Sequence, residues 1–199
     1  MSAGSTLDPA RLDLDDVVAR LGPGEPDREA THPGHHWQAA VALVLAPTDD
    51  GLAIALIERA ERVGDRWSGH MALPGGKRER GDRDLADTAA RETFEEVALV
   101  LPAPLGRLDD QRGRTTQGLV ATFVYGLEEP EPLSAHPDEV AAADWIALTW
   151  LLDPANVAKH RVVGLPFPGI THRGRIIWGL THTILDDFAG RLGLSLPRP

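Results

Sequence analysis

With 199 residues, the chain is long enough to form one domain around its own hydrophobic core. It contains no cysteine, which excludes disulfide bonds, thiolate metal sites and cysteine nucleophiles. Its formal net charge of −10 argues against nucleic-acid binding through a basic surface, although a divalent cation could join an acidic protein to a phosphorylated small molecule.

The hydrophobic periodicity and the turn residues predict alternating helices and strands along the chain. The predicted elements are, in chain order, a helix over Asp8–Leu21, strands over Trp37–Ala46 and Leu52–Ile57 joined by a hairpin turn, a short strand over Met71–Leu73, a helix over Asp84–Val97, strands over Leu119–Leu127 and Ala143–Leu148, and a closing helix over Ile176–Leu192. This order predicts an α/β (α+β) fold, in which helices pack on a mixed sheet.

The N-terminal part of the chain differs in composition from the rest. Residues 26–34 are polar and rich in turn formers, so we divide the chain into an N-terminal helix and linker, 1–34, and a main domain, 35–199. His32, His35 and His36 cluster near this boundary and could bind a metal. Loop histidines without carboxylate or cysteine partners are more often solvated.

The sequence also predicts where the protein resides. Residues 1–16 are acidic and polar, without the basic and then apolar order of a signal peptide. No apolar run approaches the roughly 18 residues that a membrane span needs. We therefore expect a cytoplasmic protein that makes no contact with a membrane.

Three glutamates on the helix predicted over Asp84–Val97 are the strongest chemical signal. Glu92, Glu95 and Glu96 have i, i+3 and i+4 spacing, which places their side chains on one helix face. Like charges at this spacing repel one another, and a hard cation such as Mg²⁺ or Mn²⁺ would relieve the repulsion. Taken alone, the triplet is more typical of a solvated acidic helix face.

The residues around the triplet favour a functional site. Arg91 can pair with one of the carboxylates or contact a substrate phosphate. Gly75 and Gly76 form a loop in which the main chain can approach an anion or offer a carbonyl to a metal. Asp82 lies where this loop meets the helix, a position that favours an acidic side chain.

The segment 75–99 resembles the signature of Nudix hydrolases. That signature reads Gly, five residues, Glu, seven residues, then Arg-Glu-aliphatic-any-Glu-Glu-any-Gly-aliphatic. Gly76 stands at the opening glycine, Asp82 at the first acid and Arg91–Leu99 at the remainder. The chain departs from the pattern in having Asp for Glu, one extra residue before Arg91, Thr93 for an aliphatic residue and Ala98 for the last glycine.

The resemblance implies a fold, a reaction and a set of site residues. The fold would be a Nudix-type α/β/α sandwich over 35–199, with helices on both faces of a mixed sheet. The reaction would be hydrolysis of a diphosphate linkage, with Mg²⁺ or Mn²⁺ as cofactor. The implied metal ligands are the carboxylates of Glu92, Glu95 and Glu96 and the carbonyl of Gly75, and the implied catalytic residues are these glutamates, Arg91 and a downstream acid. For that acid we favour Glu139 over Asp138.

Further segments resemble the coenzyme A diphosphatases of this superfamily. Leu56–Ala60, Arg66–His70 and Leu73–Gly76 keep the order of their extra signature, although not the spacing between Arg59 and Gly69. Ile177–Thr181 is similar to the start of their closing helix. The resemblance implies that Arg59, Arg66, His70 and Gly76 bind substrate, although the arginines could instead be surface ion-pair partners and the histidine structural. Trp178 is expected in the core rather than stacked on a base.

The leading hypothesis is therefore a diphosphatase that splits coenzyme A into 3′,5′-ADP and 4′-phosphopantetheine. An alternative keeps the chemistry and changes the substrate to ADP-ribose, another nucleoside diphosphate derivative or a nucleoside triphosphate. Another alternative is a ligand sensor that has the Nudix fold and no activity, but the chain retains all three glutamates. The expected partners are a small nucleotide and no nucleic acid, and the protein could form a homodimer.

Overall fold

The computed structural model describes residues 7–21, 37–61, 69–112, 118–158, 160–162 and 165–198. Its helices are α1 (Leu14–Leu21), α2 (Leu85–Val97), α3 (Leu148–Leu152) and α4 (Gly179–Arg191), with 3₁₀ turns η1 (Pro9–Arg11) and η2 (Pro154–Asn156). Its strands are β1 (Trp37–Thr48), β2 (Gly51–Arg59), β3 (Met71–Ala72), β4 (Gly75–Lys77), β5 (Gly106–Arg107), β6 (Gln111–Arg112), β7 (Gly118–Gly126), β8 (Val140–Ala147), β9 (His160–Val162), β10 (Leu165–Phe167), β11 (Gly169–His172) and β12 (Arg175–Trp178). No helix within these residues is long and apolar enough to cross a membrane.

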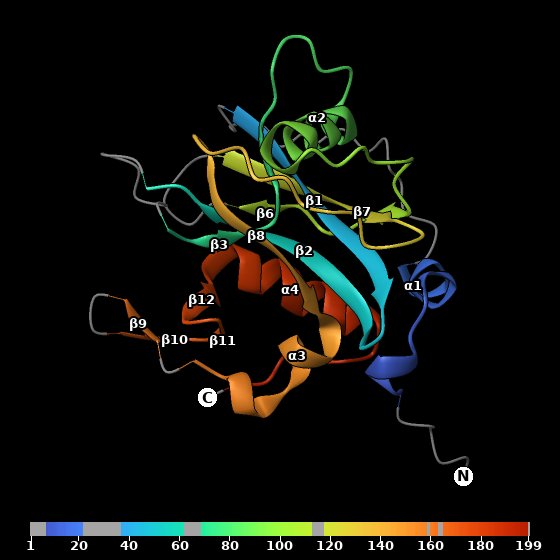
Figure 1. Ribbon diagram of the computed structural model, residues 1–199, viewed down its shortest axis with the longest axis vertical. Helices are drawn as coiled ribbons and strands as arrows, with labels where there is room; N and C mark the ends of the chain where they lie inside the picture. Colours follow the sequence, from blue (N-terminus) through green and yellow to red (C-terminus); the bar gives the residue numbers. More distant parts are fainter. Residues whose placement is uncertain are drawn as a thin grey trace.

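A mixed sheet forms the centre of the molecule (Figure 1). Its strands run in the order β3-β2-β1-β7-β5, while β4 pairs with β1, β6 with β7 and β8 with β2. Strands β1 and β7 are parallel along nine residue pairs, and the other pairs are antiparallel. The predicted mixed sheet is confirmed, and so is the β1–β2 hairpin, whose register ends at Thr48 opposite Gly51.

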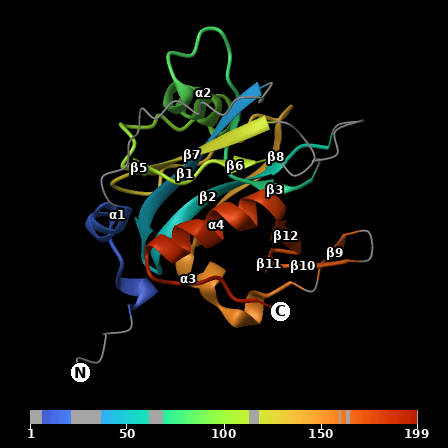
Figure 2. The same cartoon turned by 180° about the vertical axis from the view of Figure 1, so that it is seen from behind.

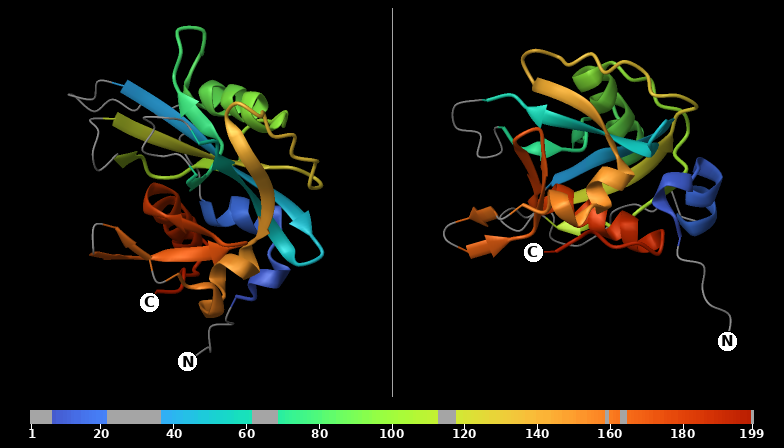
Figure 3. Two further views of the ribbon diagram at one scale, coloured as in Figure 1. Left: turned by 60° about the vertical axis from the view of Figure 1, so that its left-hand side comes forward. Right: turned by 60° about the horizontal axis from the view of Figure 1, so that its bottom comes forward.

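Side chains of the central strands alternate between two hydrophobic cores. Leu43 and Leu45 of β1 face a core shared with α1, α3 and α4, whereas Ala42 and Val44 face a core shared with α2. This burial on both faces explains why β1 reads as an unbroken apolar run in the sequence. Helices therefore cover both faces of the sheet, with α2 on one side and α4 on the other (Figures 2 and 3).

The closing helix is shorter than the sequence predicts. Residues 176–178, expected in that helix, belong to strand β12, which pairs with β11 in a hairpin. Arg173 and Gly174 both have positive φ at its turn, and Gly179, at φ +65°, redirects the chain into α4. The prediction of a helix from Ile176 was wrong because pairing with β11 decides the conformation of this short apolar stretch.

The N-terminal helix packs against the main domain. The segment predicted as one helix is divided into η1 and α1, and Val17 and Leu21 of α1 lie in the core that faces α4. The boundary drawn at residue 34 stays a prediction. The cluster of His32, His35 and His36 lies outside the described residues.

The ends of α2 are defined by specific contacts. The Asp84 carboxylate accepts a hydrogen bond of 2.7 Å from the Asp87 amide and begins the helix. Ala98 ends it in the left-handed conformation, at φ 60°. This is the position at which the Nudix signature has glycine, which adopts such a conformation without steric strain.

Replacing Ala98 with glycine should therefore stabilise the protein. The left-handed conformation costs an alanine roughly 1–2 kcal/mol, part of which the greater freedom of glycine in the unfolded chain offsets. Ala98→Gly should raise the free energy of unfolding in urea by several tenths to about 1 kcal/mol. Ala103→Gly is the matched control, because Ala103 is exposed and does not have positive φ. Equal or lower stability of Ala98→Gly would contradict the prediction.

Candidate active site

The site is built where β4 passes the C-terminal half of α2. Strand β4 pairs with β1, which places Gly75 opposite Val41 and Gly76 opposite Ala40. The Gly75 amide donates a hydrogen bond of 2.8 Å to a carboxylate oxygen of Glu96. The double glycine and the helix that follows it are thus joined by a contact between residues 21 positions apart.

Both positions require glycine, because other atoms lie too close to leave room for a side chain. A Cβ atom on Gly75 would lie 2.3 Å from the Ala40 carbonyl oxygen, and the φ of Gly75 is +147°. A Cβ atom on Gly76 would lie 2.3 Å from the carboxyl carbon of Glu92. Gly75 therefore permits the strand pairing, whereas Gly76 makes room for a site carboxylate.

Glu92 and Glu96 are carboxylates withdrawn from water. The Glu96 residue is 3% exposed and the Glu92 side chain 15% exposed. Burial raises the pKa of Glu96 to about 7, opposed by the Gly75 amide and reinforced by the nearby Glu92 and Glu139 carboxylates. Burial also raises the pKa of Glu92, opposed by Arg91. Two partly desolvated, mutually repelling carboxylates are a donor set that suits a hard divalent cation.

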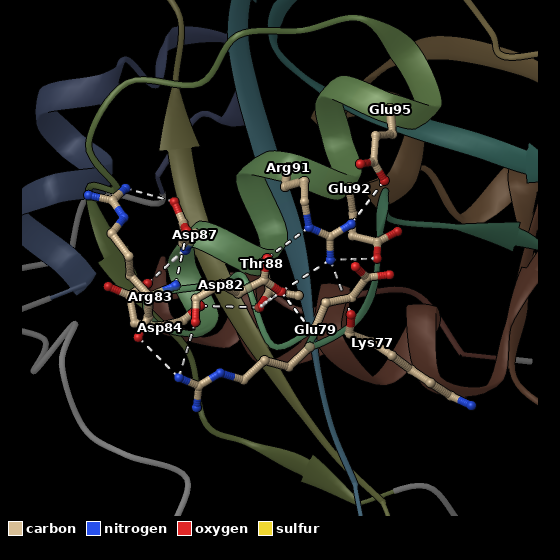
Figure 4. Close-up of polar contacts among 11 residues, drawn as sticks. Lys77, Glu79, Asp82, Arg83, Asp84, Asp87, Thr88, Arg91, Glu92 and Glu95 are labelled. Atoms are coloured by element: carbon tan, nitrogen blue, oxygen red, sulfur yellow. Dashed lines mark hydrogen bonds and ion pairs between the residues drawn. The ribbon is translucent and has the colours of Figure 1, made fainter.

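The guanidinium of Arg91 binds the acidic side chains of Asp82, Glu92 and Glu95 (Figure 4). Its guanidinium donates hydrogen bonds to Asp82 at 2.8 and 3.1 Å, to Glu92 at 3.0 Å and to Glu95 at 2.9 Å. It also donates to the Lys77 carbonyl at 3.2 Å. Arg91 therefore fixes the loop that carries Lys77 and Asp82 relative to α2, and it pairs with more than one carboxylate.

The arrangement of Glu95 differs from the sequence-based expectation. Its side chain is 50% exposed and is turned towards Arg91, whereas Glu96 is buried against Gly75. Among the described residues, no three acidic or histidine side chains are grouped closely enough to hold a metal as they stand. The assignment of Glu92, Glu95 and Glu96 as ligands of one ion therefore stays a prediction, and it requires that Glu95 first leave Arg91.

Asp82 has a structural role that the sequence alone did not reveal. Only 3% of its side chain is exposed, and it accepts hydrogen bonds from Arg91, the Glu79 amide and the Thr88 hydroxyl. The bond from Arg91 is the main reason why the pKa of Asp82 lies well below its usual range.

Glu139 lies on a loop that packs against the end of α2. The His136 amide donates to the Glu96 carbonyl at 2.9 Å, and the Ala60 amide donates to the Glu139 carbonyl at 2.8 Å. The Glu139 carboxylate raises the pKa values of both Glu92 and Glu96. The preference for Glu139 over Asp138 stays a prediction, and the charge of Glu139 at both glutamates supports it.

Of the residues that the resemblance implies in substrate binding, Arg59 and His70 lie within the described residues. Arg59, at the end of β2, lowers the pKa of Glu96 through its positive charge, so it lies beside the site. His70 contacts the ring of Trp178, with centroids 4.9 Å apart. Arg66 lies outside the described residues. Trp178, expected in the core, is only partly buried and belongs to neither hydrophobic core, so that expectation was wrong.

The raised pKa of Glu96 predicts how stability depends on pH. Between pH 4.5 and about 7 the folded protein holds a proton on Glu96 that the unfolded chain releases, so this group destabilises the fold as pH rises. Without divalent metal, Glu96→Gln should therefore be more stable than the unmodified protein at pH 8, by up to about 3 kcal/mol. The difference should shrink towards pH 5. Urea denaturation at both pH values measures it, and a difference independent of pH would contradict the assigned burial.

Comparisons with known proteins agree with this fold and site. The model of the NUDIX domain family matches residues 36–164. The Nudix hydrolase NudL of Yersinia pestis is 30% identical over 186 residues, which cover 85% of this chain and 89% of NudL. A protein of Schizosaccharomyces pombe, C14C4.10c, is 36% identical over 127 residues, 59% of this chain, and the chain spans only 37% of its length.

A solved structure extends the agreement to the fold. A MutT/nudix family protein from Enterococcus faecalis superposes with a TM-score of 0.50 at 20% sequence identity, covering 84% of this chain and 58% of that protein. The mixed α/β sandwich is thus the Nudix fold. The sequence match over residues 36–164 covers the double glycine, Arg91 and the three glutamates. This chain belongs to the Nudix family, whose members typically hydrolyse diphosphate linkages.

Proposed function

We propose that the protein is a divalent-metal-dependent hydrolase of a diphosphate linkage in a nucleotide derivative, with coenzyme A as its substrate. The observation that carries the proposal is the buried carboxylate of Glu96 and the partly buried carboxylate of Glu92, which pack against Gly75 and Gly76. Burial of like charges is costly unless a cation offsets it. An ion held there would meet the diphosphate oxygens of a substrate.

The residues have distinct roles in this proposal. Glu92, Glu96 and the carbonyl of Gly75 would hold Mg²⁺ or Mn²⁺, joined by Glu95 once it leaves Arg91. When bound, the metal offsets the charge of the diphosphate and makes hydroxide available near neutral pH. Arg59 would contact the diphosphate oxygens, and Arg66 is proposed to do the same.

Glu139 has the role of general base in this proposal. Its carboxylate lies near Glu92 and Glu96 but comes from a separate loop, so it can accept the proton of a water molecule held at the site. Arg91 acts on the glutamates rather than on substrate, because its guanidinium already donates to Asp82, Glu92 and Glu95. It is a positioning residue.

The choice of coenzyme A is supported by the segment that surrounds the site. Arg59 and His70 stand in the part of the chain that resembles the coenzyme A diphosphatases. The Arg59 amide donates to the His70 carbonyl, and the Arg59 charge acts on Glu96. The products would be 3′,5′-ADP and 4′-phosphopantetheine. The names of the relatives assign no substrate.

A substrate panel tests this proposal directly. The protein should be incubated with coenzyme A, ADP-ribose, other nucleoside diphosphate derivatives and nucleoside triphosphates, each with Mg²⁺ and with Mn²⁺, and the products read by mass. We expect release of 4′-phosphopantetheine from coenzyme A. If only another nucleotide is cleaved, the proposed reaction stands and coenzyme A is not the substrate. If no diphosphate is cleaved, the proposal is overturned.

A further inference from the structure

Three aromatic rings from separate segments meet near β3, the edge strand of the main sheet. Trp178 ends β12, Phe167 ends β10 and His70 precedes β3. The ring centroids of His70 and Trp178 are 4.9 Å apart, and those of Phe167 and Trp178 are 6.0 Å apart in an edge-to-face arrangement. We call these three residues the ring cluster.

The ring cluster is not needed to bury the β11–β12 hairpin. Ile170 and Ile177 anchor that hairpin in the core that faces α4, and each has 0% exposure. The three rings belong to neither core, and each is only partly buried. Large rings that keep part of their surface in water beside an active site are typical of ligand binding.

The ring cluster lies next to the proposed diphosphate site. The Arg59 amide donates to the His70 carbonyl at 3.1 Å, and the Gly69 amide donates to the Arg59 carbonyl at 3.0 Å. The Arg59 charge acts in turn on Glu96. Strands β3 and β12 lie side by side in both views of the molecule, and the Thr181 hydroxyl, just after β12, donates to the Met71 carbonyl at 3.0 Å (Figures 1 and 2).

Ion pairs hold Trp178 in place. Arg175 pairs with Glu58 of β2 at 2.7 Å, and Arg173 pairs with Asp144 of β8 at 2.5 Å. These contacts join the β11–β12 hairpin to the main sheet three and five residues before Trp178. A platform held in advance loses little freedom when a ligand binds, which favours affinity.

We infer that the ring cluster is the subsite for the planar base of the nucleotide whose diphosphate is cleaved. This inference rests on the proposed function and adds to it the part of the substrate that the carboxylates cannot recognise. A base presents a flat π face to Trp178 whatever its identity, so stacking there selects a nucleotide over a base-free phosphate ester. It does not by itself select one base over another.

Binding of two ligands that differ only in the base tests the inference. AMP and ribose 5-phosphate should be titrated calorimetrically, with Mg²⁺ present, into the unmodified protein, Trp178→Ala and Trp150→Ala. We expect the unmodified protein to bind AMP more tightly by roughly five- to a hundredfold, the range expected for one base stacked on one ring. In Trp178→Ala that preference should fall to about one, while the affinity for ribose 5-phosphate changes little.

Trp150→Ala is the matched control. Trp150 contacts His172 of the same hairpin, with centroids 5.8 Å apart, but it lies on α3 and is 44% exposed. It should keep the preference for AMP, so loss in both variants would mean that the hairpin has moved and would overturn the inference. An unchanged preference in folded Trp178→Ala would overturn it equally.

His70→Ala keeps the inference testable if Trp178→Ala fails to fold, as judged by circular dichroism. Loss of most of the AMP preference in His70→Ala supports the ring cluster, and full retention overturns it. Because calorimetry needs no turnover, the outcome is separable from the substrate panel. If the protein cleaves coenzyme A but its preference for AMP over ribose 5-phosphate does not depend on Trp178, the present inference is overturned and the proposed function stands.

Discussion

Glu96→Gln should lower turnover by roughly a hundredfold or more while leaving the fold intact. The side-chain amide can still accept the hydrogen bond from Gly75, so the contact between β4 and α2 is kept. What is lost is the negative charge that a divalent ion would bind. Steady-state rates with the best substrate of the panel measure the effect, and melting curves check the fold.

A second carboxylate of the same segment provides the control for Glu96→Gln. Glu79 is exposed between β4 and α2, and its amide donates to Asp82. Glu79→Gln should retain the turnover of the unmodified protein. Full activity of Glu96→Gln would contradict the assignment of Glu96, and a comparable loss in Glu79→Gln would point to a general effect of charge.

Gly76→Ala should inactivate the protein without unfolding it. The added methyl group would overlap the Glu92 carboxylate, which is the mobile end of its side chain and can move away. We expect a melting temperature within a few degrees of the original and a loss of turnover similar to that of Glu92→Gln, roughly a hundredfold. Measuring both variants side by side tests whether displacement of Glu92 accounts for the loss.

Neighbouring glycines separate this effect from general strain. Gly75→Ala would meet the Ala40 carbonyl and the Val41 Cα at 2.3 and 2.6 Å, and should lose about 3 kcal/mol of stability or more. Gly81→Ala meets no atom within 4 Å and should behave as the unmodified protein. A fully active Gly76→Ala, or one as unstable as Gly75→Ala, would contradict the placement of Glu92.

Local patterns predicted most of the fold. Strand β1 was recognisable because it is buried on both faces and reads as a continuous apolar run, and α2 because its apolar residues recur at helical spacing. Strand β12 was mistaken for helix because four residues are too few to show a period. Gly174 was the missed signal, because glycine is typical of turns, and in the structure both Arg173 and Gly174 have positive φ.

The sequence proposes the residues of the candidate site but not how their side chains are arranged. Spacing along α2 placed Glu92, Glu95 and Glu96 on one face, but it could not tell which of them Arg91 would hold. That depends on Asp82, which is fixed by Thr88 and sets the position of the guanidinium. Likewise, the ring cluster brings His70 together with Trp178 from a distant part of the chain, and no local pattern shows such a contact.

The most direct test of the proposed site is the effect of divalent metal on melting temperature at pH 8. A bound cation should relieve the repulsion between the Glu92 and Glu96 carboxylates. Millimolar Mg²⁺ or Mn²⁺ should therefore raise the melting temperature of the unmodified protein. Glu96→Gln should show little of this rise, and Glu79→Gln all of it. If metal does not change the melting temperature of the unmodified protein, or raises that of Glu96→Gln equally, then Glu92 and Glu96 do not form a metal site.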